Sequence, residues 1–312
     1  MRQEAYFCTV KELDELGKNN IPRQLISHTH LIYSSPATLA FNSPGAEGFG
    51  VKRAGLAVPD SVMLIVSPGC CGRNTSVLSS MRAYQDRFYY LLMDETDIVT
   101  GRHLKKIPKA VAEICEGLKK KPSVVMICIT CVDALLGTDM ERVCHKAEEY
   151  AGVPVRPCYM YALTREGRKP PMVHVRQSVY SLLEPKKKKG NVVNLLGYFS
   201  PLTDDCELYD LLHGAGVKTI HEISRCKDYA QYQTMSEANF NLVLHPEARF
   251  AAEDFHDRLK IPYIELRRLY QIDKIASQYR ALAAALGVEF EDEIPRKAAE
   301  EAVEKFLSLI HI

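Results

Sequence analysis

The sequence has no excess of charge of either sign and no long apolar run. Forty Lys and Arg side chains stand against 39 Asp and Glu side chains. This balance gives no support to a nucleic-acid partner or to a membrane surface. The longest central apolar runs, such as residues 124–129, are far too short to cross a bilayer. The N-terminal residues include early acids and no apolar core of a secretory signal, so we expect a cytoplasmic protein.

Common catalytic motifs are also missing. The glycine-rich stretch at residues 42–50 lacks the G-x-x-x-x-G-K-[ST] spacing of a P-loop. No G-x-G-x-x-G opens a helix after a strand, and no G-x-S-x-G elbow is present. A nucleotide-binding or serine-hydrolase function therefore has no support. His28 and His30 are interpreted as part of an ordinary polar segment, with metal binding as the alternative.

Cysteine, by contrast, is abundant, with ten in 312 residues. In a cytosol these thiols stay reduced, which favours metal or redox chemistry over disulfides. Most of them are still expected to be small buried hydrophobes. Cys115, Cys144 and Cys206 lie on predicted helices, and Cys128 lies inside an apolar run that points into the core.

Short apolar runs alternate with amphipathic stretches along the chain. Strands are expected at residues 62–66, 123–129, 153–158, 192–198, 218–223, 241–246 and 261–266. Helices are expected between them, for example at residues 104–120, 138–152, 204–216 and 271–287. Thr138 is the expected N-cap of the second of these, with Glu141 at the capping-box spacing. The pattern predicts an α/β fold of two doubly wound, Rossmann-like parallel sheets.

Residues 184–191, EPKKKKGN, predict a domain boundary. Four adjacent lysines repel one another, so we expect a solvated linker, with a docking site for an acidic partner as the alternative. The chain then divides into an N-terminal α/β domain, residues 1–188, and a second α/β domain with a C-terminal helix, residues 189–312. The last six residues, LSLIHI, resemble translated adapter sequence, and the natural chain is expected to continue.

Three thiols follow two of the predicted strands. Cys70 and Cys71 come after the strand at 62–66, and Cys131 comes after the strand at 123–129. Ligands bind at the carboxyl ends of strands in open α/β sheets, and neighbouring strands lie about 5 Å apart. If these two strands are neighbours, the thiols can share one small inorganic cluster. Gly69 and Gly72 would let the backbone approach it closely.

Four interpretations of these thiols remain open at this point. Iron–sulfur ligation needs thiolates in a glycine-rich pocket whose amides bond the sulfurs. A structural zinc site commonly uses two C-x-x-C pairs, and the sequence offers one, Cys128 and Cys131. Redox chemistry of the adjacent pair Cys70 and Cys71 would need a strained small ring. The last interpretation is that the thiols bind nothing.

Four stretches in order resemble the nitrogenase component 1 type proteins. That family includes the chains of molybdenum–iron protein, their cofactor-scaffold relatives and the catalytic subunits of dark protochlorophyllide reductase. The stretches are PDSVMLIVSPGCCGRN (59–74), DETDIVTGRHLKKI (94–107), ICITCVDALLGTDM (127–140) and GVPVRPCYM (152–160). Residues 193–220 resemble the opening strand and helix of the family's next domain.

The resemblance implies that Cys71 and Cys131 are cluster ligands, with Cys70 as a neighbour that could replace Cys71. The family's earlier cluster cysteine falls near Gly45, where this chain has no cysteine. Two cysteines in each chain suit a 4Fe-4S cluster shared across the two-fold interface of a homodimer, or of a heterodimer with a related subunit.

The resemblance also implies a function. The chain is expected to be the electron-accepting component of a nitrogenase-like two-component reductase, served by an ATP-dependent iron protein. One alternative is a scaffold for metal-cofactor assembly. Another is a two-lobed small-ligand binding protein with structural cysteines. The resemblance implies a third α/β domain that we expect to be missing from this sequence, so the substrate and any catalytic residue stay unknown.

Overall fold

The computed structural model describes residues 9–17, 20, 44–69, 79, 81–82, 84–160, 169–267, 269, 271–289, 297 and 299–305. Two four-stranded sheets, parallel throughout, organise this part of the chain. The first has the order β2 (Phe88–Leu92), β1 (Val62–Ser67), β3 (Val125–Ile129) and β4 (Val155–Tyr159). The second has the order β6 (Thr219–His221), β5 (Val192–Leu196), β7 (Phe240–Val243) and β8 (Tyr263–Glu265). The predicted α/β fold with doubly wound sheets is confirmed.

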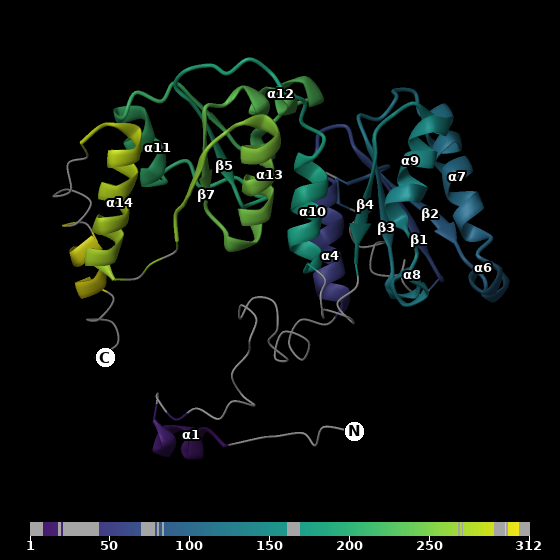
Figure 1. The fold of residues 1–312 in the computed structure, drawn as a ribbon, viewed down its shortest axis with the longest axis horizontal. Helices are drawn as coiled ribbons and strands as arrows, with labels where there is room; N and C mark the ends of the chain where they lie inside the picture. The colour runs from purple at the N-terminus through teal and green to yellow at the C-terminus, as the bar shows by residue number, and fades with distance from the viewer. Residues whose placement is uncertain are drawn as a thin grey trace.

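Helices cover these sheets (Figure 1). In the first half they are α4 (Pro44–Gly55), α6 (Glu95–Thr100), α7 (His103–Gly117), α8 (Cys131–Leu136), α9 (Met140–Ala151) and α10 (Pro171–Tyr180). The helix α1 (Val10–Leu16) lies apart from both sheets in Figure 1. The second half adds α11 (Glu207–Gly214), α12 (Tyr229–Gln233), α13 (Arg249–Leu259), α14 (Ile272–Leu286) and the 3-10 turns η2 (Ile223–Arg225), η3 (Thr234–Glu237) and η4 (Pro246–Ala248). Within the described ranges, every helix is too short or too polar to span a lipid bilayer.

The N-cap of helix α9 lies one residue later than predicted. Asp139 is its N-cap, and the Asp139 carboxylate accepts a hydrogen bond from the backbone N–H of Arg142. The prediction that Thr138 caps this helix is wrong, because the Thr138 hydroxyl donates to Asp133 at 3.2 Å instead. The helix ends at Gly152, whose φ of +61° places it in the left-handed region that glycine tolerates.

Both sheets reverse their winding at the same place in their order. From β1 the chain adds β2 on one side and then β3 on the other, and from β5 it adds β6 on one side and then β7 on the other. The reversal brings two strand ends together in each sheet. Val66 pairs with Ile129 in the first sheet, and Leu196 pairs with Val243 in the second. Such crevices at the carboxyl edge are where doubly wound sheets bind ligands.

The helix α10 joins the two sheets. One face of the first sheet packs on α7 and α9, and its other face packs on α4 and α10 (Figure 1). The apolar cluster on the face that packs on α4 and α10 continues through Val175 and Val179 of α10 to Leu196 and Val243 of the second sheet. The expected linker is exposed at Lys186 and Lys187. It is also fastened to η3, since Lys188 donates to the carbonyl of Ser236 at 2.6 Å and Lys189 pairs with Glu237.

Candidate functional site

The ends of β1 and β3 lie side by side, as the cluster hypothesis requires. Gly69 follows β1 by two residues, and Cys131 follows β3 by two residues. Cys131 was expected in a loop, but its backbone begins the helix α8. Cys70, Cys71 and Gly72 lie outside the described residues, as does the side chain of Cys131. The structure therefore brings Gly69, the residue before the cysteine pair, and the backbone of Cys131 to one edge of the sheet.

The other cysteine predictions concern the core. Cys128 and Cys144 are buried, as expected, and burial raises the pKa of the Cys144 thiol. Cys115 is half-buried on α7, and Cys206 is half-buried at the N-cap of α11, one residue before the helix begins. Gly45, at the place of the family's earlier cysteine, lies in the first turn of α4, whereas His28 and His30 are outside the described residues. Within the described ranges, no three His, Cys, Asp or Glu residues are grouped as metal ligands.

Three buried polar atoms lie at the edge of the first sheet where β1 and β3 end, and they lack a hydrogen-bond partner among the described residues. They are Ser67 Oγ at the end of β1, Thr130 Oγ1 after β3, and Asp133 Oδ2 in the first turn of α8. An unsatisfied buried polar group costs about 1–3 kcal/mol, so such groups are rare unless something else completes them. Hydroxyl donors beside thiolates are what an iron–sulfur cluster needs around its sulfurs. The hydroxyls of Ser67 and Thr130 are donors of this kind, whereas the carboxylate oxygen of Asp133 is an acceptor.

His103 fixes the position of the helix that carries Cys131. Its Nδ1 lies 3.0 Å from the carbonyl oxygen of Asp97, and its Nε2 lies 2.9 Å from Asp133 Oδ1. Both side chains of the pair are almost fully buried, at 1% and 0% exposed. Because a carbonyl can only accept, Nδ1 must donate, and the imidazole and the carboxyl group share one further proton. This contact holds α8 against the first turn of α7.

Asp97 anchors the other side of His103. Its carboxylate accepts hydrogen bonds from Lys106 and Arg102, both at 2.7 Å, and the residue lies in a capping box with Asp94. The hydrogen bond from Lys106, followed by that from Arg102, lowers the pKa of Asp97 to about 2. Asp97 is therefore a fixed negative charge at neutral pH.

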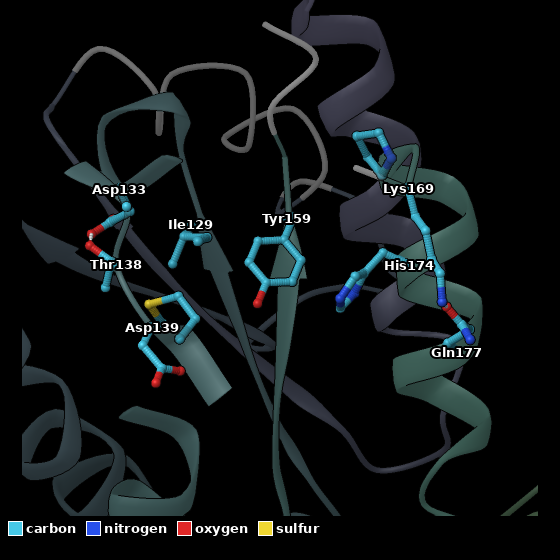
Figure 2. Close-up of a pocket in the computed structure, with 11 residues that line it drawn as sticks. Ile129, Asp133, Thr138, Asp139, Tyr159, Lys169, His174 and Gln177 are labelled. Atoms are coloured by element: carbon cyan, nitrogen blue, oxygen red, sulfur yellow. Dashed lines mark hydrogen bonds between the residues drawn. The ribbon is translucent and has the colours of Figure 1, made fainter. Parts of the chain in front are cut away.

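A cavity of about 450 Å³ adjoins α8 at the carboxyl ends of β3 and β4. Figure 2 shows Asp133, Thr138 and Asp139 on one side and Lys169, His174 and Gln177 on the other, with Ile129 and Tyr159 between them. The Lys169 ammonium donates to Gln177 Oε1 at 2.8 Å. The cavity thus has a carboxylate wall and a wall from α10.

His174 is a neutral group in this cavity. Its ring meets the ring of Tyr159 edge-on at 4.3 Å between centroids. Burial, with a smaller contribution from the charge of Lys169, lowers the pKa of His174 to about 4. At neutral pH the imidazole can therefore accept one hydrogen bond and donate another.

A second cavity, of about 790 Å³, opens at the crevice of the second sheet. Tyr198 follows β5 and His245 follows β7, and their rings meet edge-on at 5.7 Å between centroids. Charged side chains also line it, from Arg249, Glu253, Glu265 and Arg267, together with the apolar Val243, Leu244, Pro246, Phe250 and Leu266. Arg249 is paired with Glu253 and Glu265, each at 3.2 Å. No sequence motif marks this site, although the rule that ligands bind at the carboxyl ends of strands points to it when applied to Leu196 and Val243.

The model of the nitrogenase component 1 type oxidoreductases matches residues 47–311. The chain belongs to this family. Its structure also resembles a chain of the solved structure titled "Nitrogenase Cp1 at pH 6.5", with a TM-score of 0.59 and 18% identity, over 80% of this chain and 59% of that one. A second structure, "Nitrogenase Cp1 at pH 5", gives a TM-score of 0.53. These likenesses agree with the fold described above.

Among this family, the chain is similar to proteins named nitrogenase iron-molybdenum cofactor biosynthesis protein NifE. The protein of Nostoc sp. is 27% identical over 239 residues, covering 74% of this chain and 49% of that protein. The protein of Klebsiella pneumoniae is 27% identical over 266 residues, covering 78% of this chain and 58% of that protein. The component 1 type chain described here thus spans about half the length of the curated relatives that it matches.

Proposed function

We propose that this chain is part of a scaffold on which a metal–sulfur cofactor is assembled. The observation that carries the proposal is the pairing of β1 with β3, because Gly69 follows the first strand and Cys131 follows the second at the same edge. The names of the relatives, cofactor biosynthesis proteins, favour a scaffold over the electron-accepting component that the resemblance first implied. The scaffold would work in the cytoplasm, where thiols stay reduced.

In this proposal Cys71 and Cys131 hold an iron–sulfur cluster, with Cys70 as the alternative to Cys71. Gly69 and Gly72 would allow the backbone close to it, and the hydroxyls of Ser67 and Thr130 could donate to its sulfurs. When bound, such a cluster supplies one-electron transfer. Two thiolates in each chain make half of a 4Fe-4S ligand set, so a second copy or a related subunit would supply the other half.

Exposed apolar side chains support a partner at this edge. Leu92 at the end of β2 is 60% exposed, Val99 on α6 is 85% exposed and Leu136 on α8 is 50% exposed. In Figure 1, α6 and α8 lie at the same end of the first sheet. Large apolar side chains gathered at one exposed place are typical of protein interfaces. A subunit seated here would cover them and close the cluster site.

The cofactor under assembly would be the cargo of the second cavity. Its volume of about 790 Å³ suits a ligand of cofactor size. His245 offers a ring nitrogen, and Arg267 offers a guanidinium to anionic groups. In this proposal the iron–sulfur cluster binds at the edge of the first sheet, and the cofactor under assembly binds in the cavity at the second sheet.

Anaerobic purification tests the cluster. We expect a brown protein with about four irons per dimer, and loss of the iron in Cys71→Ala and in Cys131→Ala. Cys128→Ala, which removes a buried thiol from the same C-x-x-C, is the matched control and should keep its iron. A chain that stays colourless and binds no iron after anaerobic reconstitution would contradict the proposal and favour a ligand-binding protein with structural cysteines.

A second candidate function is the electron-accepting subunit of a two-component reductase. The oxidoreductase description of the matching family favours it. In that case an ATP-dependent iron protein would dock at the cluster edge. Addition of such a reductase with ATP separates the two functions, because a reductase subunit sustains many turnovers of substrate. A scaffold instead releases an assembled cofactor once.

A further inference from the structure

We propose that Arg176 is a positioning residue that shapes the second cavity from outside it. Arg176 lies on α10, is 4% exposed, and is not among the residues that line the cavity. Its guanidinium donates hydrogen bonds to Gly197, which precedes the lining residue Tyr198. It also donates to Glu247, whose backbone N–H bonds the lining residue His245. The inference rests on the proposed function only for the cavity's role as the cargo site.

The first wall is held through Gly197. Arg176 donates to the carbonyl oxygen of Gly197 from Nε at 3.1 Å and from Nη2 at 2.7 Å, and Tyr198 follows directly. Gly197 has a φ of +138°, and a Cβ built on it would lie 2.7 Å from the backbone nitrogen of His245. The ends of β5 and β7 therefore approach more closely than any side chain at residue 197 would permit. The two donors fix the carbonyl at this point of contact.

The second wall is held through Glu247. Arg176 Nη1 donates to Glu247 Oε2 at 2.7 Å, and the backbone N–H of Glu247 donates to Nδ1 of His245 at 3.3 Å. Oε2 of the same Glu247 carboxylate also lies 3.6 Å from His245 Nδ1. The guanidinium also lies over the ring of Phe199, 5.0 Å from its centroid. One planar group with a fixed fork of donors thus sets both walls, which a lysine ammonium could not do.

The support for this guanidinium comes from the first sheet. Val173, Val175 and Val179 of α10 are fully buried, and His174 packs on Tyr159 at the end of β4. The helix α10, which carries Arg176, is therefore packed on the end of β4 beside the first cavity. Substitution of Arg176 should loosen the cavity walls and leave the β1–β3 edge as it is.

Hydrogen–deuterium exchange on the full chain tests the inference without iron or cargo. In Arg176→Met we expect amide exchange to rise about tenfold or more at residues 196–199 and 244–248, where Leu244 N–H bonds the carbonyl of Leu196. Arg176→Lys keeps the charge but not the fork, so exchange should still rise. Arg258→Met is the matched control, because Arg258 on α13 donates to the carbonyls of Tyr180 and Leu183 and touches neither wall.

A second arm keeps the test informative if Arg176→Met fails to fold. Glu247→Gln replaces the charge-assisted hydrogen bond of one connection by a weaker neutral one, so exchange should rise at residues 244–248 and not at 196–199. The ring-nitrogen NMR signals of His245 should shift in Glu247→Gln and remain unchanged in Arg258→Met. Unchanged exchange in the Arg176 or Glu247 variants, or an equal rise in the Arg258 control, would overturn the inference. Because neither readout uses a cluster, a failed iron-binding test would leave these results intact.

Discussion

His103 Nε2 and Asp133 Oδ1 lie 2.9 Å apart inside the protein, although the residues are 30 positions apart in the chain. Together with the contact of His103 Nδ1 to the carbonyl oxygen of Asp97, they link the Asp97 anchor to the helix that begins at Cys131. The position of Cys131 therefore depends on a buried polar pair rather than on the short helix α8 alone.

Removal of one partner of this pair should destabilise the protein strongly. In Asp133→Ala the imidazole of His103 is left buried without its acceptor, and breaking a buried pair in this way costs about 3–5 kcal/mol. Urea unfolding followed by circular dichroism measures the loss. Asp139→Ala, which removes only the N-cap of α9, should cost about 1 kcal/mol. Equal losses in the two variants would contradict the buried pair's importance.

Gly197→Ala should be costly for a different reason. The added Cβ would lie 2.7 Å from the His245 nitrogen at a φ of +138°, so backbone must move. We expect a loss of about 2–4 kcal/mol in the free energy of unfolding, measured in urea. Gly287→Ala is the control, since Gly287 also has a positive φ of +70° but no atom within 4 Å. There the loss should be about 1 kcal/mol.

The buried His174 should make the fold sensitive to acid. Its pKa falls from 6.5 to about 4 in the folded protein, so the folded state prefers the neutral ring. As pH falls from 6.5 towards 4, the unfolded chain gains a proton that the folded chain refuses, and stability is lost. Between pH 7 and pH 4.5, the free energy of unfolding should fall by about 2 kcal/mol less in His174→Asn than in the unsubstituted protein. His256→Gln, at an exposed position on α13, should leave the loss unchanged.

Cys226 should react slowly while the protein is folded. Burial, followed by the charge of Asp228, raises the pKa of its thiol from 9.0 to about 11. At pH 8 its thiolate is then about 100-fold scarcer than in an unfolded chain, and iodoacetamide should label it correspondingly more slowly. The associated stability is fully present below pH 9 and is lost as pH rises through 11. Mass spectrometry with and without urea gives both rates, and similar rates would contradict the burial.

Continuous apolar runs in the sequence predicted the fully buried central strands. Every residue of β3 is buried, and a continuous apolar run is what such a strand requires. By contrast, β2 was missed because it lies at the edge of its sheet, where Tyr90 and Leu92 are exposed and no buried run marks the strand. The helix α8 was read as a loop, because its six residues are held by His103 from elsewhere in the chain.

The candidate site shows the same limit. Strand ends could be located from sequence, and the pairing of β1 with β3 confirmed that they meet. Arg176 could not be identified in this way, because its partners lie 21 and 71 residues away and depend on which strands become neighbours. Local propensity carries no information about such contacts.

The apolar cluster that passes through α10 bears on how this protein can be dissected. A cut after residue 188 follows the lysine run that the sequence marks as a boundary, yet it would leave Val175 and Val179 on one piece without Phe255 and Leu196 on the other. Each fragment would expose a face that water disfavours. The two sheets should consequently melt in one cooperative transition, and separately expressed halves should aggregate.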